Sequence, residues 1–161
     1  METLDAYDLA ILKHLQEDGR ITNAELAQRV GLSAAPCWRR VRELERAGFI
    51  TGYRAVINRH KIGLGVLAFV RLDAAQTSGA QLRQMEDAIR AAPDIVSCHY
   101  ISGSGTFELQ VVSADLDSFS RFARDVLLHL PNVKDMHTSF SLGEVKAAGA
   151  LPLGQLGRQP R

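Results

Sequence analysis

The stretch ITNAELAQRVGLSAAPCWRRVRELERAGFI, residues 21–50, decides the fold of the first part of this 161-residue chain. It is typical of a short helix, a glycine-containing turn and a longer helix rich in arginine. Thr22 and Glu25 have the spacing of a capping box, in which each side chain satisfies the other residue's free backbone N–H. Gly31 can adopt the left-handed conformation that ends a helix, and Ser33 is a suitable N-cap for the next one. The pattern predicts a helix-turn-helix, whose second helix normally lies in the DNA major groove.

Charge is distributed unevenly around this motif. The formal net charge is only +1, but residues 1–35 carry six acidic and three basic side chains, whereas residues 36–61 carry seven basic and two acidic ones. An isolated run of this kind is more often a solvated helix face with ion pairs. Here the basic run coincides with the second helix of the motif, and contact with DNA phosphates requires such a stripe.

Helical spacing turns Val41, Leu44 and Ala47 inward, so the other faces of the second helix are free for DNA. An arginine can bond guanine O6 and N7 bidentately, whereas phosphate contacts position the protein without reading sequence. Trp38 has a second interpretation, packing against the neighbouring helix. The candidates for contact with base edges and backbone are Ser33, Ala35, Trp38, Arg39 and Arg42. The candidates for phosphates are Arg40, Arg46 and Arg54.

The rest of the sequence predicts one more helix and then a change in the spacing of the apolar residues. Residues 4–17 carry apolar side chains at helical spacing, which completes a three-helix unit. Residues 49–53 are expected to form a small wing or a strand that leaves the domain. Beyond residue 62 the order is β-α-β-β-α-β, which is that of the ferredoxin-like split βαβ unit. The expected strands are 65–72, 95–101, 107–112 and 133–142, and the expected helices run from Ser78 to near Pro93 and from Asp115 to Leu130 with Leu116 inward.

This organisation resembles the Lrp/AsnC (leucine-responsive/asparagine regulator) family of bacterial transcription factors. LDAYDLAILKHLQEDGRITNAELAQRVGLS (4–33) resembles the family's opening, and APCWRRVRELERAGFITGY (35–53) its recognition helix and exit. LLHLPNVKDMHTSFSLGEVK (127–146) resembles its last helix and strand. The resemblance implies an oligomeric, sequence-specific regulator that binds double-stranded DNA, forms dimers and octamers or other higher oligomers, and responds to a small amino acid.

We therefore expect an α+β protein with an N-terminal three-helix (winged) helix-turn-helix domain and a C-terminal ferredoxin-like βαββαβ domain. The expected boundaries are 1–52 for the DNA-binding domain, 53–63 for a linker strand or hinge, 64–146 for the oligomerisation and effector-binding domain, and 147–161 for a flexible tail. An acidic N-terminus and the absence of a membrane-spanning apolar run predict a cytoplasmic protein without a membrane partner. The resemblance adds an association with the bacterial nucleoid.

A glycine-rich turn is the candidate effector site. Backbone N–H groups in such a turn can capture a carboxylate. Glu108 is the nearest acid and is a candidate for neutralising the ammonium of an amino acid, although strand alternation can equally point it elsewhere. The resemblance implies that this turn contributes to the effector pocket, but the family often has acidic residues beside its glycine. A plain hairpin connection and an effector-independent protein stay open as alternatives. The turn comprises Ser102, Gly103, Ser104, Gly105 and Thr106.

No catalytic, metal or cofactor site is expected. The two cysteines are too few and too isolated for a disulfide framework or a zinc site. Cys37 lies in a first helical turn, so a redox-sensing thiol and a small packing residue are its two interpretations. His99, His129 and His137 lack metal-ligand spacing. Two other functions compete with the regulator: an architectural DNA-compacting protein with weak sequence preference, and a small-molecule-binding or enzymatic module, against which the arginines of the second helix argue.

Overall fold

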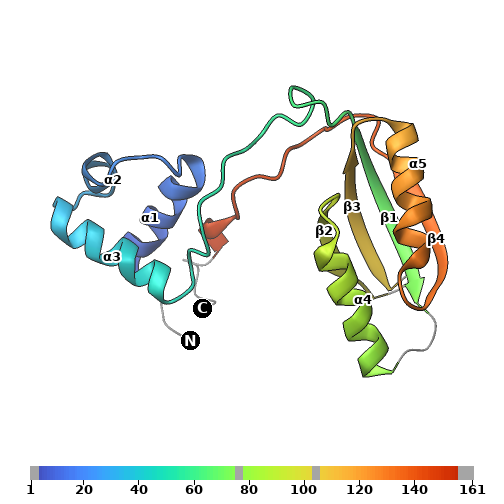
Figure 1. Cartoon of the computed structure of the whole chain (residues 1–161). Coiled ribbons are helices and arrows are strands. Elements are labelled where there is room, and N and C mark those ends of the chain that lie inside the picture. The colour runs from blue at the N-terminus through green and yellow to red at the C-terminus, as the bar shows by residue number, and fades with distance from the viewer. Residues whose placement is uncertain (1–3, 75–77, 103–105, 156–161) are drawn as a thin grey trace. The chain divides into compact units, whose positions relative to one another are not determined.

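The computed structural model (Figure 1) describes residues 4–74, 78–102 and 106–155. Within these residues the chain divides into two compact units. The N-terminal unit comprises residues 4–56 together with 146–155, and the C-terminal unit comprises residues 57–145.

The N-terminal unit contains three helices, α1 (Ala6–Glu17), α2 (Asn23–Val30) and α3 (Ala34–Arg46). The expected capping box at the start of α2 is confirmed, because Glu25 N–H donates to Thr22 Oγ1 over 3.2 Å and Thr22 N–H donates to Glu25 Oε2 over 3.1 Å. A second capping box, formed by Asp5 and Asp8, begins α1. The helices enclose one small apolar core made of Ile11, Leu26, Ala27, Cys37 and Leu44.

The turn between α2 and α3 has the predicted geometry. Gly31 ends α2 in the left-handed conformation, with φ 74° and ψ 32°. Leu32 N–H then donates to Ala27 O over 2.9 Å. The side-chain amide of Asn23 donates to Ala34 O over 2.9 Å and thereby joins the first turns of the two helices. Ser33 is the N-cap of α3 in an extended conformation, but its side chain makes no capping hydrogen bond.

The segments that flank the helices also belong to the N-terminal unit. Residues 49–53, where a wing or strand was expected, form neither helix nor strand. Tyr53 in this segment donates its hydroxyl hydrogen to Glu45 Oε1 over 3.2 Å. The tail returns to α1, where Leu151 N–H donates to Gln16 Oε1 over 2.6 Å, just before the short 3-10 helix η2 (Leu153–Gln155). The flexibility expected of the whole tail stays a prediction.

The C-terminal unit has the predicted β-α-β-β-α-β order. Its four antiparallel strands are ordered β2-β3-β1-β4, so β2 and β4 are the edges. A short 3-10 helix, η1, follows α5. The elements are β1 (Val66–Ala74), α4 (Gly79–Ala91), β2 (Ile95–Tyr100), β3 (Phe107–Ser113), α5 (Leu116–Asp125), η1 (Leu127–His129) and β4 (Val133–Phe140).

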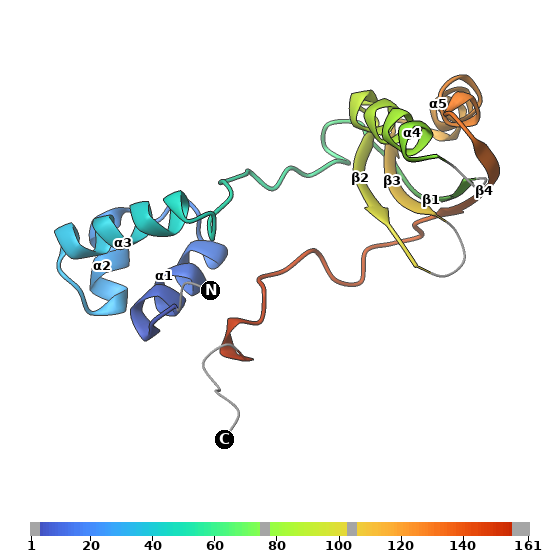
Figure 2. The same cartoon turned by 90° about the horizontal axis from the view of Figure 1, so that it is seen from below.

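Both long helices of this unit cover the same face of the sheet, as Figure 2 shows. Alternate residues of the two central strands point toward them, and Val70, Leu72, Leu109 and Val111 are fully buried. The helices contribute Met85, Ile89, Phe119 and Ala123 to the same core. The residues between the buried ones point to the opposite face, which we call the open face. Its members on the central strands include Phe69, Arg71, Asp73, Glu108 and Gln110.

The structure corrects three details of α5 and β4. Leu116, expected inward, is 59% exposed. Phe119, Phe122 and Ala123 form the inner stripe of α5, and at ~100° per residue Leu116 lies roughly 70° from the middle of that stripe. The helix ends at Asp125 rather than continuing to Leu130, although η1 still buries Leu127. The last strand ends at Phe140, two residues before the expected end.

Candidate nucleic-acid interface and effector site

Helix α3 has one buried and one exposed face. Its buried face contributes Cys37 and Leu44 to the core, at 0% and 4% exposed. Trp38 is 55% exposed and Arg39 is also exposed, so both side chains reach solvent on the other face. The exposure of Trp38 favours its availability for DNA over packing against a neighbouring helix, and its role in DNA contact stays a prediction.

Arg42 is oriented by two neighbours on the same helix. Its guanidinium lies 5.9 Å from the centre of the Trp38 ring, which is within cation–π range. The same guanidinium donates to Glu45 Oε2 over 3.0 Å. These contacts hold Trp38 and Arg42 together as one exposed pair. Because the two side chains are already restrained, they would lose less conformational entropy on binding DNA.

Arg46 pairs with Glu43 through two of its guanidinium nitrogens, one of which donates from Nε over 3.0 Å. The hydrogen bonds from Arg46 hold the pKa of the Glu43 carboxyl below its ordinary value. Both side chains are more than half exposed, so the pair contributes little to stability. A phosphate would therefore compete with Glu43 for a guanidinium that is already at the protein surface.

Arg40 points back to the first helix instead of outward. Its Nη1 lies 2.7 Å from Asp5 Oδ2 and 2.8 Å from Asp8 Oδ1. Its guanidinium carbon also lies 5.4 Å from the centre of the Tyr7 ring. The hydrogen bond with Asp8 raises the pKa of Arg40. Arg40 therefore joins α3 to α1, and any phosphate contact would have to share it with these carboxylates.

The other candidates for DNA contact are exposed. Ser33 and Ala35 lie at the N-terminal end of α3, and Arg54 lies in the segment that follows the helix. Among the described residues, Arg39 and Arg54 form none of the ion pairs. Their charges are thus available to DNA without loss of an existing partner.

Cys37 is a packing residue. Its side chain is fully buried between the helices, and this burial raises the pKa of its thiol. A redox-sensing thiol needs a lowered pKa and solvent access, and Cys37 has neither. The packing interpretation made from the sequence is therefore confirmed.

The predicted effector turn lies at the end of the sheet where β2 stops and β3 begins. Gly103, Ser104 and Gly105 lie outside the described residues. Thr106 N–H donates to Leu72 O over 2.7 Å, and Thr106 Oγ1 accepts from Ala74 N–H over 3.0 Å. Ser102 is exposed. The turn is thus fastened to the end of β1 by the backbone and hydroxyl of Thr106.

Glu108 lies on the open face and has a partner there. It stands directly opposite Arg71 in the pairing of β1 with β3, and Arg71 Nη2 lies 3.8 Å from Glu108 Oε2. Strand alternation thus separates Glu108 from Phe107, whose side chain is buried on the helix-covered face. An ammonium group at Glu108 would therefore meet a carboxylate that is already close to a guanidinium.

A cavity of about 400 Å³ lies between α4 and the edge strand β2. Its wall includes Tyr100 and Phe107, the residues on either side of the turn region, whose rings meet edge to face at 5.4 Å. Glu86 and Arg90 add a charged pair to the wall, with Arg90 Nη2 3.1 Å from Glu86 Oε2. Sequence reasoning missed these two helix residues, although their i,i+4 spacing was the available signal.

Among the described residues, no helix is both long enough and apolar enough to cross a lipid bilayer.

Two family models match this chain in succession. A winged helix-turn-helix DNA-binding model matches residues 4–51, and the Lrp/AsnC ligand-binding domain matches residues 67–151. The first match covers the three helices that present the arginines, and the second covers the sheet and its helices. The gap between the two matches contains the first boundary between the units of the structure, at residues 56 and 57, and the second match continues into residues 146–151 of the N-terminal unit.

Curated relatives and solved structures agree with these matches. The leucine-responsive regulatory protein of Rhizobium meliloti is 43% identical over 90% of this chain and 93% of its own length. That of Escherichia coli K12 is 39% identical over 92% of this chain and 90% of its own length.

Among solved structures, a transcriptional regulator from Neisseria meningitidis in complex with L-Met has a TM-score of 0.91 and 38% identity, covering 96% of this chain and 99% of that one. An AsnC family transcriptional regulator from Agrobacterium tumefaciens has a TM-score of 0.89 and 30% identity, covering 94% and 99%. This chain therefore belongs to the Lrp/AsnC family of DNA-binding transcriptional regulators.

Proposed function

We propose that this regulator reads DNA through the exposed face of α3 and that a small amino acid bound by the C-terminal unit tunes its assembly. The observation that carries the DNA half is the division of α3 into two faces. Cys37 and Leu44 are buried on one face, while Trp38, Arg39 and Arg42 lie exposed on the other.

Within this interface the arginines have different roles. Arg39 and Arg42 are the base-reading candidates, because a guanidinium matches the two acceptors of guanine in the major groove. Arg46 and Arg54 contact phosphates, and Ser33 and Ala35 approach the DNA at the start of the helix. Arg40, which pairs with two carboxylates of α1, chiefly positions α3.

Assembly falls to the C-terminal unit. A single helix-turn-helix reads only a few base pairs, and a dimer that presents two such helices is the usual remedy. No described residue of this unit's helices covers the open face of the sheet, which leaves that face available to a second copy. We propose dimers that associate further into octamers or another higher oligomer, in a cytoplasmic protein associated with the nucleoid.

The effector site comprises the Ser102–Thr106 turn and the adjoining cavity between α4 and β2. A relative of 38% identity was solved in complex with L-Met. The apolar wall residues Ile89 and Phe107 suit the side chain of such an amino acid, and Glu86 and Arg90 offer charges of both signs for its ammonium and carboxylate. Ligand binding shifts an assembly equilibrium only if the amino acid binds the two states with different affinity.

The DNA half is tested by Arg39→Ala combined with Arg42→Ala in the full chain at fixed salt concentration. We expect a loss of specific affinity of at least about tenfold, since each good bidentate contact contributes ~1–3 kcal/mol of discrimination. Unchanged affinity would show that α3 is not the reading helix. Genome-wide mapping of bound sites provides a second test, because uniform coverage in place of discrete palindromic sites would favour an architectural role.

The effector half is tested by thermal unfolding of the full chain with each of the twenty amino acids. A ligand that binds only the folded state raises stability by mass action, so at least one amino acid should raise Tm. The absence of any shift at millimolar ligand would refute amino-acid sensing and leave the DNA half intact.

A further inference from the structure

Glu45 lies between the exposed face of α3 and the segment that follows this helix. Its two carboxylate oxygens have different donors. Arg42 Nη1 donates to Oε2 over 3.0 Å, and the hydroxyl of Tyr53 donates to Oε1 over 3.2 Å. Glu45 is the less exposed member of the ion pair, with 28% of its side-chain surface exposed against 65% for Arg42. The carboxylate is therefore held from both sides, by the helix and by the following segment.

The hydroxyl that holds Glu45 belongs to a residue with its own packing partner. Tyr53 lies in the same unit as α3. A Cβ on Gly19, which follows α1, would lie 3.4 Å from Tyr53 Cδ1, so the ring lies beside this glycine. Burial raises the pKa of the Tyr53 hydroxyl, and the hydrogen bond with Glu45 raises it further. The phenol therefore keeps its proton at neutral pH and remains a donor to the carboxylate.

The other end of this chain of contacts is the exposed pair proposed to contact DNA. The Arg42 guanidinium lies 5.9 Å from the centre of the Trp38 ring. Trp38, Arg42 and Glu45 are spaced by four and three residues, so they share one stripe of α3. A long side chain loses rotamer freedom when it pairs with a partner. Because Arg42 is restrained by a carboxylate and by an aromatic ring, part of this loss occurs before DNA arrives.

The two acidic residues near the end of α3 differ in what they hold. DNA phosphates repel a negative charge, so either carboxylate lowers the sequence-independent part of the affinity. Glu43 pairs with Arg46, a candidate for phosphate contact, and both side chains are more than half exposed. Phosphate contacts do not read sequence, so the orientation of Arg46 has no consequence for base preference. Glu45 instead holds Arg42, a candidate for base contact, whose orientation does matter.

We propose that Glu45 is a positioning residue that sharpens the base preference of Arg42, with Tyr53 as its anchor. This inference rests on the proposed function, in which Arg42 reads a base in the major groove. A bidentate contact with guanine O6 and N7 requires one orientation of the guanidinium. The residues that support a contacting side chain determine how precisely it is held. Without Glu45, Arg42 retains its charge and still attracts DNA, but it discriminates less between bases.

The test measures the base preference of the full chain. Repeated selection from a library of random duplexes with the parent chain yields a preferred duplex. Binding of the parent and of each variant is then measured, at fixed salt concentration, to this duplex and to its single-base-pair substitutions. Arg42→Ala identifies the base pair that Arg42 reads, as the position where discrimination falls by at least about fivefold.

We expect Glu45→Ala to lower discrimination at that base pair by about two- to fivefold, which is the range that exposed ion pairs supply. Discrimination at the other positions should stay the same, and affinity for DNA of random sequence should rise because a negative charge is lost. Tyr53→Phe removes only the hydroxyl and should lower discrimination at the same base pair. An unchanged value for Tyr53→Phe would overturn its role as the anchor.

Glu43→Ala is the matched control, because it removes the same charge and another i,i+3 ion pair from the same helix. It should change affinity about equally for all duplexes and leave discrimination at the Arg42 base pair unchanged. Circular dichroism checks that each variant is folded. Base preference is a ratio of two affinities of one preparation, so a loss of folded protein alone does not alter it.

Three results would overturn the proposal. If Arg42→Ala abolishes discrimination at one base pair and Glu45→Ala leaves it unchanged, Glu45 does not position Arg42, and the proposed function still stands. If Glu45→Ala alters base preference even in an Arg42→Ala chain, Glu45 contacts DNA directly. If Arg42→Ala itself alters no base preference, the base-reading role of Arg42 fails, and the inference fails with it.

Discussion

The guanidinium of Arg40 on α3 lies 2.8 Å from the carboxylate of Asp8 on α1 (Nη1–Oδ1). The same nitrogen lies 2.7 Å from Asp5, the N-cap residue of α1. Arg40 thus joins α3, which carries the candidates for DNA contact, to α1. From the sequence alone, Arg40 was expected to bind phosphate.

We expect Arg40→Ala to lower the free energy of unfolding of the N-terminal unit by about 1–2 kcal/mol, because it leaves two carboxylates without their partner. Arg39→Ala, the control, should change it by less than about 0.5 kcal/mol. Trp38 is the only tryptophan of the chain, so its fluorescence in urea reports this unit. If Arg40→Ala weakened DNA binding but left the urea midpoint unchanged, phosphate contact would be the main role of Arg40.

Acid should loosen the same helix pair. Hydrogen bonds from Asp8 N–H and Arg40 hold the pKa of the Asp5 carboxyl below its ordinary value. Its contribution to stability is therefore fully present above the ordinary aspartate pKa of about 3.9, and it is lost as pH falls through the lowered value. Because Asp5 is nearly half exposed, the contribution is modest. Asp5→Asn retains a good N-cap without the charge, and its urea midpoint should fall less steeply between pH 5 and pH 3 than that of the parent chain. Equal slopes would contradict this assignment.

Gly31→Ala should destabilise the helix-turn-helix by about 1 kcal/mol or more, because alanine is strained at φ 74°. A Cβ at this position would meet nothing within 4 Å, so the cost arises from the backbone alone. Gly31→Asn is the matched variant, since asparagine tolerates the left-handed region, and it should cost less. Equal losses for the two variants in thermal unfolding would contradict the left-handed backbone conformation as the source of the cost.

Cys37 should resist thiol reagents in the folded protein. Burial raises the pKa of its thiol and removes solvent access, so both the thiolate fraction and the encounter rate are low. In a Cys98→Ser chain, 5,5′-dithiobis(2-nitrobenzoate) should react with Cys37 only as fast as the N-terminal unit opens. In urea, where the chain is unfolded, Cys37 should react completely. Rapid stoichiometric labelling without urea would restore the redox interpretation.

Thr106→Val should destabilise the C-terminal unit by about 1–3 kcal/mol. The substitution leaves the partly buried Ala74 N–H without the hydroxyl that accepts its hydrogen bond over 3.0 Å. Thr106→Ser retains that acceptor and should behave nearly as the parent chain in thermal unfolding. If both variants were as stable as the parent, the hydroxyl would have no structural role, and a direct contact with an effector would become the better explanation for this residue.

Much of the fold can be derived from local patterns in the sequence. The capping box of Thr22 and Glu25 and the left-handed Gly31 act over a few residues, and both appear in the structure as predicted. The sheet order also follows, because the β-α-β-β-α-β arrangement permits few alternatives. Leu116 was misplaced because a helix face is set by the whole inner stripe and not by one apolar residue.

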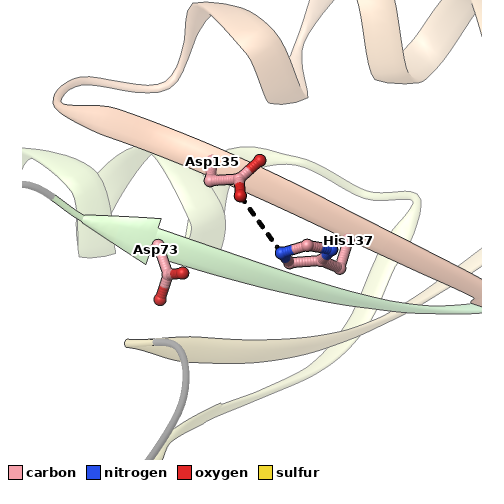
Figure 3. Close-up of side chains that lie close together, drawn as sticks. All are labelled: Asp73, Asp135 and His137. Carbon is pink, nitrogen blue, oxygen red and sulfur yellow. Dashed lines mark ion pairs between the residues drawn. The ribbon is translucent and has the colours of Figure 1, made fainter.

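The partners of individual charges depend on tertiary structure. Arg40 and Arg39 are adjacent in sequence and chemically identical, yet packing directs one to the carboxylates of α1 and leaves the other at the surface. Strand pairing likewise decides that Glu108 faces Arg71 and that Asp73 faces Asp135 (Figure 3). By itself the sequence determined the elements and their order, since these depend on short-range periodicity and capping. Only the tertiary structure decided which distant charges meet, because that depends on helix packing and strand register.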